Sequence, residues 1–232
     1  MKVLAVDTSA NVATASVVED DRLLAEKIVD YKKTHSETLM PMIDEVLGAS
    51  GLDISEIDLF AVANGPGSFT GLRIGVSTIK GIAHASDKPV VEISTLEAMA
   101  YNLFYADAVI SPIMDARRGQ VYNAVYEWKN GELKTLSEPR ALSIEELIED
   151  LEQYNKKIIF LGDGVPVHRE YILEKLPGKA VLAPPSANRQ RASSIATLAL
   201  MKQSEQKSCF EVAPVYLRKP QAERELEERS NK

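Results

Sequence analysis

The sequence has little that would tie the protein to an oxidising compartment or to a membrane. Among 232 residues there is one cysteine, Cys209, so no disulfide can form within the chain. No apolar run approaches the length that spans a bilayer. The run that begins at Val3 meets a charge at Asp7, too early for the apolar core of a secretory signal. We therefore expect a cytoplasmic protein.

An excess of positive charge is also missing. Lys and Arg number 27 against 34 Asp and Glu, which gives a net charge of -7 and a pI near 5.2. Because nucleic-acid backbones are bound by basic surfaces, this balance argues against direct binding over a broad face. Hydrophobic residues make up 45% of the chain, which is enough for one domain or two small ones.

Patterns that carry chemistry are sparse. The three histidines stand alone, and His35 has Leu39 where a zinc-binding helix would place its second ligand. Ser68 and Thr70 belong to no G-x-S-x-G nucleophile pattern. We predict no metal site and no catalytic residue.

Two halves of the chain show the same order of expected elements. Each half begins with an apolar strand that ends in aspartate and leads into a three-stranded meander, followed by helices and a further strand. The strands are expected at 3–6, 12–18, 23–29, 58–63 and 90–93, and then at 108–114, 120–128, 133–136 and 157–161. The helices are expected at 34–47, 72–83 and 95–105, and then at 143–154, 165–176 and 192–202. This repetition predicts a duplicated α/β protein with domains at 1–106 and 107–220 and a loose charged tail at 221–232.

The helix expected at 34–47 has signals at both ends. Thr34 and Glu37 have the spacing of a capping box, and Gly51 is placed to end the helix. The apolar stripes of this helix and of the next cover more of their circumference than one sheet face needs. Core packing is the ordinary interpretation of such stripes, yet their width also favours a pair of partner-binding helices.

Residues 65–73, GPGSFTGLR, form a glycine-rich turn between an expected buried strand and the second helix. Backbone N–H groups at a helix start can bind a phosphate. The loop lacks both the Lys-Ser or Lys-Thr ending of a P-loop and the GxGxxG spacing. Phosphate binding therefore stays open beside the simpler role of permitting tight turns and close packing.

Acids end the first strand of each meander, at Asp7 and Asp115. Because open sheets bind ligands at their carboxyl ends, these acids could face a nucleotide across a cleft. The candidate nucleotide site comprises Asp7, Thr8, Ser9, Asp115, Gly162 and Gly164. Acids at strand ends are also common turn residues, and the Arg117-Arg118 pair crowds the second turn, so no complete nucleotide cradle is visible.

Five segments, taken in order, cover essentially the whole chain. They read LAVDTS at 4–9, HSETLMPMIDEVL at 35–47, GPGSFTGLRIGVSTIKGIA at 65–83, DARRGQVYNAVY at 115–126 and APVYLRKP at 213–220. This combination resembles the bacterial TsaB family, formerly YeaZ. The resemblance implies an actin-like ATPase (ASKHA) fold made of two duplicated ribonuclease-H-like domains.

The resemblance also implies a role in making threonylcarbamoyladenosine beside the tRNA anticodon. TsaB is regarded there as a non-catalytic scaffold that binds the catalytic paralogue TsaD, with the small ATPase TsaE joining the complex. We expect a homodimer when TsaD is absent, contact with tRNA only through the complex, and any ATP or ADP at the interface with TsaD and TsaE. The implied partner-binding residues are His35, Leu39, Met42, Ile43, Val46, Leu72, Arg73, Val76, Ile79 and Lys80.

One departure from TsaD is visible in the chain. A His-x-x-x-His metal pair is expected in TsaD after the strand at 90–93, whereas this chain has Thr95 and Met99 there. Neither side chain replaces a neutral imidazole well. Two other functions remain open: a self-sufficient ATP-using kinase or hydrolase, and a peptidase, for which the sequence offers neither a nucleophile nor a metal ligand.

Overall fold

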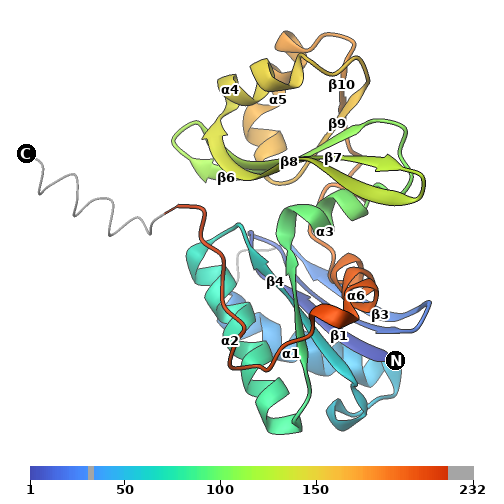
Figure 1. Ribbon diagram of the computed structural model, residues 1–232. Helices are drawn as coiled ribbons and strands as arrows, with labels where there is room; N and C mark the ends of the chain where they lie inside the picture. Colours follow the sequence, from blue (N-terminus) through green and yellow to red (C-terminus); the bar gives the residue numbers. More distant parts are fainter. Residues whose placement is uncertain (31–33, 219–232) are drawn as a thin grey trace, which may run out of the picture.

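Two five-stranded sheets organise the protein into two lobes (Figure 1). The computed structural model describes residues 1–30 and 34–218. The first sheet has the order β3-β2-β1-β4-β5, and its strands are β1 (Lys2–Asp7), β2 (Ala13–Glu19), β3 (Arg22–Val29), β4 (Leu59–Gly65) and β5 (Val90–Ser94). The first three strands form an antiparallel meander, whereas β4 is parallel to β1 and β5 is parallel to β4.

The second sheet repeats this topology. Its order is β10-β9-β6-β7-β8, and its strands are β6 (Val109–Arg117), β7 (Gln120–Lys129), β8 (Glu132–Ser143), β9 (Ile158–Leu161) and β10 (Ala180–Leu182). Helices follow equivalent strands in the two lobes: α1 (His35–Ser50) and α4 (Ile144–Leu151), α2 (Phe69–Ser86) and α5 (Gly164–Lys175), α3 (Thr95–Tyr101) and α6 (Ala192–Met201). Short 3-10 turns lie at η1 (Ile54–Glu56) and η2 (Gln203–Glu205). The predicted duplication is confirmed.

The elements stack in layers around apolar clusters. Helices α1 and α2 cover one face of the first sheet, and α6 with part of α3 covers the other. Helix α3 also packs against the inner face of the second sheet, whose outer face is covered by α4 and α5. Figure 1 shows α3 between the two lobes. Successive side chains of β1 point to opposite faces of the sheet, which explains this arrangement. Leu4 and Val6 face α1 and α2, whereas Val3 and Ala5 face α6.

The ends of the first two helices agree in part with expectation. Gly51 ends α1 in the left-handed region, at φ 67°, as predicted. Helix α2 begins at Phe69, three residues before the expected start, and the Ser68 side chain caps it. The prediction of a capping box at the start of α1 is wrong. The Thr34 hydroxyl makes no capping bond and instead receives a hydrogen bond from the Ser36 hydroxyl at 3.3 Å, while the Glu37 amide donates to the Thr34 carbonyl at 3.1 Å.

Several boundaries differ from the sequence prediction. Strand β8 runs to Ser143 rather than ending near Leu136, because it pairs with β7 along almost its whole length. Helix α3 ends at Tyr101, four residues early, and the edge strand β10 was not expected.

In the middle of β6, where Pro112 has no N–H to donate, the buried Asn123 side chain donates to the Pro112 carbonyl at 2.9 Å.

Helix α6 packs against the first sheet, although the sequence assigned it to a second domain at 107–220. Its buried residues join the cluster on the inner face of β1 and β4. The Glu26 carboxylate on β3 holds the helix start, accepting hydrogen bonds from Arg191 Nε at 3.1 Å and from the Ser193 amide at 3.0 Å. By packing, residues 192–201 therefore belong to the first lobe.

A segment that we call the strap, residues 207–218, also returns to the first lobe (Figure 1). Lys207 pairs with Val90 at the edge of β5, through N–H···O bonds of 2.8 and 3.0 Å. Farther along, the Val215 amide donates to the Asn64 carbonyl at 2.7 Å. The charged tail expected at 221–232 lies outside the described residues.

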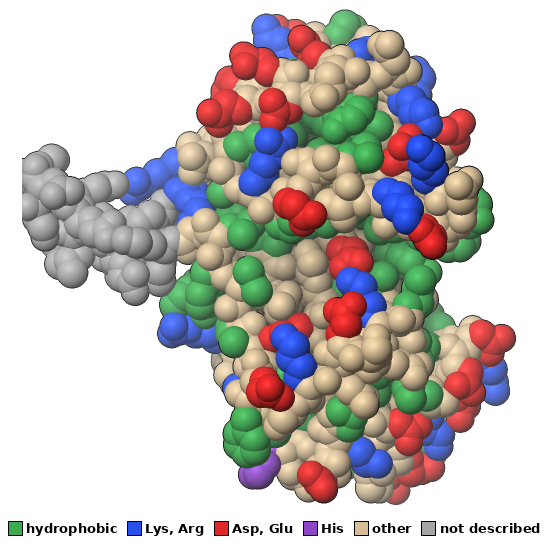
Figure 2. Space-filling model, viewed as in Figure 1, with side chains coloured by type: hydrophobic (Ala, Val, Ile, Leu, Met, Phe, Trp, Pro, Cys, Tyr) green, Lys and Arg blue, Asp and Glu red, His purple; other side chains and the backbone are tan. Residues whose placement is uncertain are grey.

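Charges of both signs are interspersed over the face drawn in Figure 2. No extended basic patch is visible on that face, which agrees with the net charge of -7. Among the helices of residues 1–30 and 34–218, none combines the length and apolar character needed to cross a membrane.

Candidate functional site

A cleft of about 430 Å³ lies between the lobes where β1 and β6 end. The predicted Ser9 and Asp115 line it, together with Asp163 from the turn after β9. Asp7 and Thr8 belong to the same strand end and are 1% and 2% exposed. The structure thus brings the two predicted acids to one region, and Asp163 joins them because its Oδ1 accepts a hydrogen bond from the Asp115 amide at 3.2 Å.

Burial changes the acid chemistry at this cleft. Asp7 Oδ1 accepts the Ser9 amide at 2.7 Å, while Oδ2 has no hydrogen-bond partner. Desolvation raises the pKa of Asp7 to about 6, and the nearby charge of Asp163 adds to the rise. Desolvation also raises the pKa of Asp163. Within the described ranges no three His, Cys, Asp or Glu side chains are grouped as metal ligands.

The glycine-rich loop packs against the end of β1, and its residues Gly67, Ser68 and Phe69 also line the cleft. The Ser68 amide at the helix start donates to the Ser9 carbonyl at 2.6 Å, and the Thr8 hydroxyl donates to the Gly71 carbonyl at 2.7 Å. A Cβ on Gly67 would lie 2.3 Å from the Ser9 carbonyl oxygen, and one on Gly71 would lie 2.0 Å from that of Thr8. These glycines allow α2 to sit directly on the end of β1.

The turn after β9, which contains Gly162 and Gly164, is packed as closely against neighbouring residues. A Cβ on Gly162 would lie 2.2 Å from the Ile113 carbonyl oxygen and 2.6 Å from the Met99 methyl group, and Gly164 also packs on Ile113. Thr95 and Met99, which stand at the positions expected for the metal ligands of TsaD, are both fully buried in α3. A threonine hydroxyl and a thioether at these positions do not fit the metal of TsaD.

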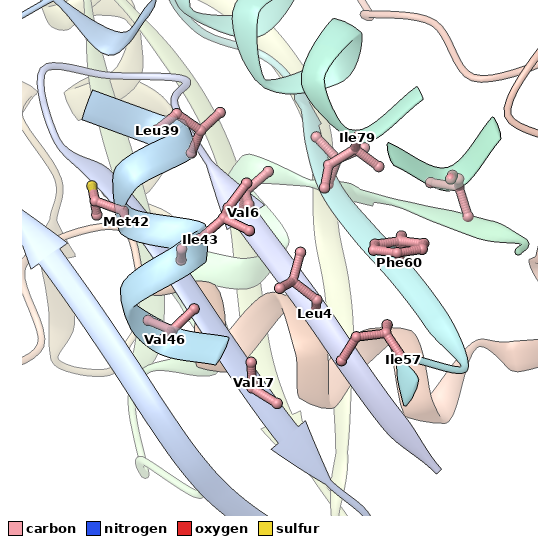
Figure 3. Close-up of a cluster of buried hydrophobic side chains, with 14 of the residues drawn as sticks. Leu4, Val6, Val17, Leu39, Met42, Ile43, Val46, Ile57, Phe60 and Ile79 are labelled. Atoms are coloured by element: carbon pink, nitrogen blue, oxygen red, sulfur yellow. The ribbon is translucent and has the colours of Figure 1, made fainter. Parts of the chain in front are cut away.

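Seven of the predicted partner-binding residues are core residues of the first lobe. Between 0% and 3% of each is exposed: Leu39, Met42, Ile43, Val46, Leu72, Val76 and Ile79. Figure 3 shows side chains of α1 and Ile79 of α2 in the same apolar cluster as Leu4, Val6 and Phe60. The width of an apolar stripe therefore does not distinguish a deep core from a free surface, and the role of these residues in partner binding stays a prediction.

A groove between α1 and α2 contains the surface that these helices do expose. It consists of two hollows, of about 480 and 420 Å³, and Met40 lines both. Met40 is 52% exposed. The predicted residues His35, Leu39 and Arg73 line the first hollow and Ile43 lines the second; the other apolar lining residues include Phe69, Ile74, Leu47, Ile54 and Ile82. We call this depression the α1–α2 groove.

Three predicted cationic or polar contact residues already have partners inside the chain. His35 Nε2 lies 2.7 Å from the Ala10 carbonyl oxygen. Lys80 donates to the Val212 carbonyl of the strap at 2.8 Å, and Arg73 Nε donates to the Tyr216 hydroxyl at 3.0 Å. The strap was missed by sequence reasoning, although the segment APVYLRKP that carries Tyr216 was among those that supported the resemblance.

Solved structures place this architecture in a known fold class. YeaZ from Pseudomonas aeruginosa superposes with a TM-score of 0.78 at 25% identity and covers 93% of this chain and 99% of its own. Component A of (R)-2-hydroxyglutaryl-CoA dehydratase from Acidaminococcus fermentans matches with a TM-score of 0.53 at 12% identity, covering 88% and 99% of the two chains, and supports the fold alone. The protein has the actin-like ASKHA fold of two ribonuclease-H-like lobes.

Sequence comparisons identify the family. The family model described as "TsaD: tRNA N6-adenosine threonylcarbamoyltransferase" matches residues 22–226. The tRNA threonylcarbamoyladenosine biosynthesis protein TsaB of Bacillus subtilis is 34% identical over 96% of both chains, and that of Haemophilus influenzae is 29% identical over 94% of both. The chain belongs to the TsaB (YeaZ) family, within the TsaD-related proteins.

Proposed function

We propose that this chain is a non-catalytic subunit in the formation of threonylcarbamoyladenosine in tRNA, and that it acts by binding TsaD through the α1–α2 groove. Membership of the TsaB family supports the process. The observation that carries the mode of action is the apolar groove, in which Met40 stays 52% exposed between two hollows.

The groove is suited to helices of a protein partner. Apolar residues from two neighbouring helices form its walls, with Leu39 and Ile43 in its floor. An amphipathic helix that enters such a groove buries apolar surface on both sides and forms a mixed helix bundle. We propose that TsaD supplies these helices, that a second copy of the chain does so when TsaD is absent, and that TsaE and tRNA join through the complex.

Non-catalytic action is supported by the chemistry of the cleft. Asp7 is buried and Asp163 is partly buried. The glycine loop packs closely on the end of β1, and Thr95 and Met99 are poor metal ligands. We propose that the isolated chain binds no nucleotide tightly and that any ATP or ADP lies at an interface with TsaD and TsaE. Calorimetry of the isolated chain with millimolar ATP should give no binding heat. Tight binding with turnover would favour the alternative of a self-sufficient kinase or hydrolase.

Replacement of Met40 by glutamate tests the docking surface. A charge in the centre of a desolvated interface has no partner, so we expect the affinity for TsaD to fall by about tenfold or more. Because Met40 is half exposed, the isolated chain should keep its melting temperature. An arginine at Val76, by contrast, would be buried in the core and would unfold the lobe. Leu173→Glu is the matched control, since Leu173 is 41% exposed on α5 of the other lobe.

Reconstitution tests the process. Purified TsaD, TsaE and unmodified tRNA from the same organism are supplied with ATP and threonylcarbamoyl-adenylate, the donor of the transferred group. They are assayed with and without this chain, and the modified nucleoside is measured by mass spectrometry. We expect modification to require the chain and to fall with Met40→Glu but not with Leu173→Glu. Equal modification without the chain would show that it has no role in the process.

A further inference from the structure

The strap ends in a cluster of three side chains from two distant parts of the sequence. Tyr216 packs on Phe69, with ring centroids 4.7 Å apart and an interplanar angle of 34°. The Arg73 guanidinium lies 3.8 Å above the Phe69 ring, and Arg73 Nε donates to the Tyr216 hydroxyl at 3.0 Å. Each side chain of the Phe69–Arg73–Tyr216 cluster therefore holds the other two.

This cluster forms part of two surfaces at once. Phe69 and Tyr216 line the cleft between the lobes, whereas Phe69 and Arg73 line the first hollow of the α1–α2 groove. Phe69 is the first residue of α2 and belongs to both linings. A displacement of Tyr216 at the cleft thus removes the support of the groove wall.

The strap is anchored on both sides of Tyr216. One residue before it, the Val215 amide is bonded to Asn64 of β4. Two residues after it, the Arg218 side chain donates to the Ala116 carbonyl of the second lobe at 2.6 Å. Tyr216 consequently lies where the strap passes from one lobe to the other.

We propose that Tyr216 is a positioning residue for the docking groove: it fixes Phe69 and Arg73 in the arrangement that the partner meets, and it links the groove to the cleft between the lobes. This inference rests on the proposed function of the groove. A wall that is already ordered loses less side-chain entropy when a partner binds. Because such coupling is reciprocal, a partner seated in the groove must also stabilise the strap.

Three variants of the full-length chain test the positioning role by calorimetry with purified TsaD. Tyr216→Ala removes the ring and hydroxyl, and we expect affinity to fall by about two- to tenfold, the range for one aromatic contact. Tyr216→Phe keeps the ring and should restore affinity to within about twofold. Phe210→Ala is the matched control, because Phe210 is a 72% exposed strap residue that packs on His84, away from the groove.

Hydrogen exchange of the wild-type chain provides a second test that needs no variant. Binding of TsaD should slow exchange of the Val215 amide, which the strap holds against β4. Unchanged affinity of Tyr216→Ala, or an equal loss with Phe210→Ala, would overturn the positioning role, and so would unaltered exchange at Val215. If Met40→Glu still weakens binding in those cases, the docking groove stands; if it does not, the proposed function fails as well.

Discussion

Replacement of Asp7 by asparagine should make the stability of the protein less dependent on pH. Asp7 is 1% exposed, and its Oδ2 atom has no hydrogen-bond partner. Folding raises its pKa from 3.8 to about 6, mainly through desolvation. The native state therefore binds this proton more tightly than the unfolded chain does. The stability that the proton provides is fully present below pH 3.8 and is lost as pH rises to about 6.

The size of the effect follows from the shift. At about 1.4 kcal/mol per pKa unit, moving the pKa of Asp7 from 3.8 to about 6 corresponds to about 3 kcal/mol of lost stability at neutral pH. Asparagine has nearly the same shape, cannot ionise, and keeps an oxygen to accept the Ser9 amide. Relative to the wild type, the variant should gain about 2–3 kcal/mol between pH 4 and pH 7.5.

Urea denaturation at a series of pH values from 4 to 7.5 measures this gain. The measured quantity is the change with pH in the difference in unfolding free energy between variant and wild type. Any pH-independent cost of the buried amide therefore cancels. Asp21→Asn, at an exposed turn residue, controls for the loss of one negative charge. A difference between Asp7→Asn and wild type that stays constant over this range would refute the argument that burial raises the pKa of Asp7.

Two further predictions concern buried polar contacts. Asn123→Ala should lower the unfolding free energy by about 2–3 kcal/mol, because the buried amide donates to Ser111, Pro112 and Ala124 at 2.9 to 3.0 Å. Urea denaturation measures this loss, with Asn155→Ala at an exposed position as the control. Equal stability of the two variants would contradict the prediction. Glu26→Gln should cost about 1–3 kcal/mol and speed hydrogen exchange in α6, because the Glu26 side chain is only 7% exposed. The control is Glu45→Gln, which removes an exposed ion pair and should lower the unfolding free energy by less than about 1 kcal/mol. A similar loss in Glu26→Gln and Glu45→Gln would show that the contact of Glu26 with α6 is weak.

The duplication could be predicted from the sequence because local residue patterns indicate each of the repeated strands and helices. Short apolar strands that lead into Asp7 and Asp115, and the periodic helices that follow each meander, recur in the same order. These signals depend on neighbouring residues, which single-sequence reasoning uses best. The placement of α6 could not be predicted in this way, because periodicity shows that a helix has an apolar face and not which sheet that face covers.

The candidate surfaces were harder to predict than the fold. Val76 and Met40 are both apolar residues of expected helices, yet one is 3% and the other 52% exposed. The difference depends on how α1 and α2 pack on the sheet and on each other, which is tertiary information. The strap has no periodicity at all, and its position depends on single contacts such as that between Tyr216 and Phe69.

The packing of α6 on the first sheet has a consequence for folding during synthesis. The first lobe is discontinuous: its inner sheet face, with Val3 and Ala5, is covered by a helix made after the whole second sheet. At typical translation speeds that interval is on the order of ten seconds. During it, the apolar face of the finished strands has no α6 to cover it, so the nascent chain passes through an aggregation-prone stage that a continuous domain would avoid.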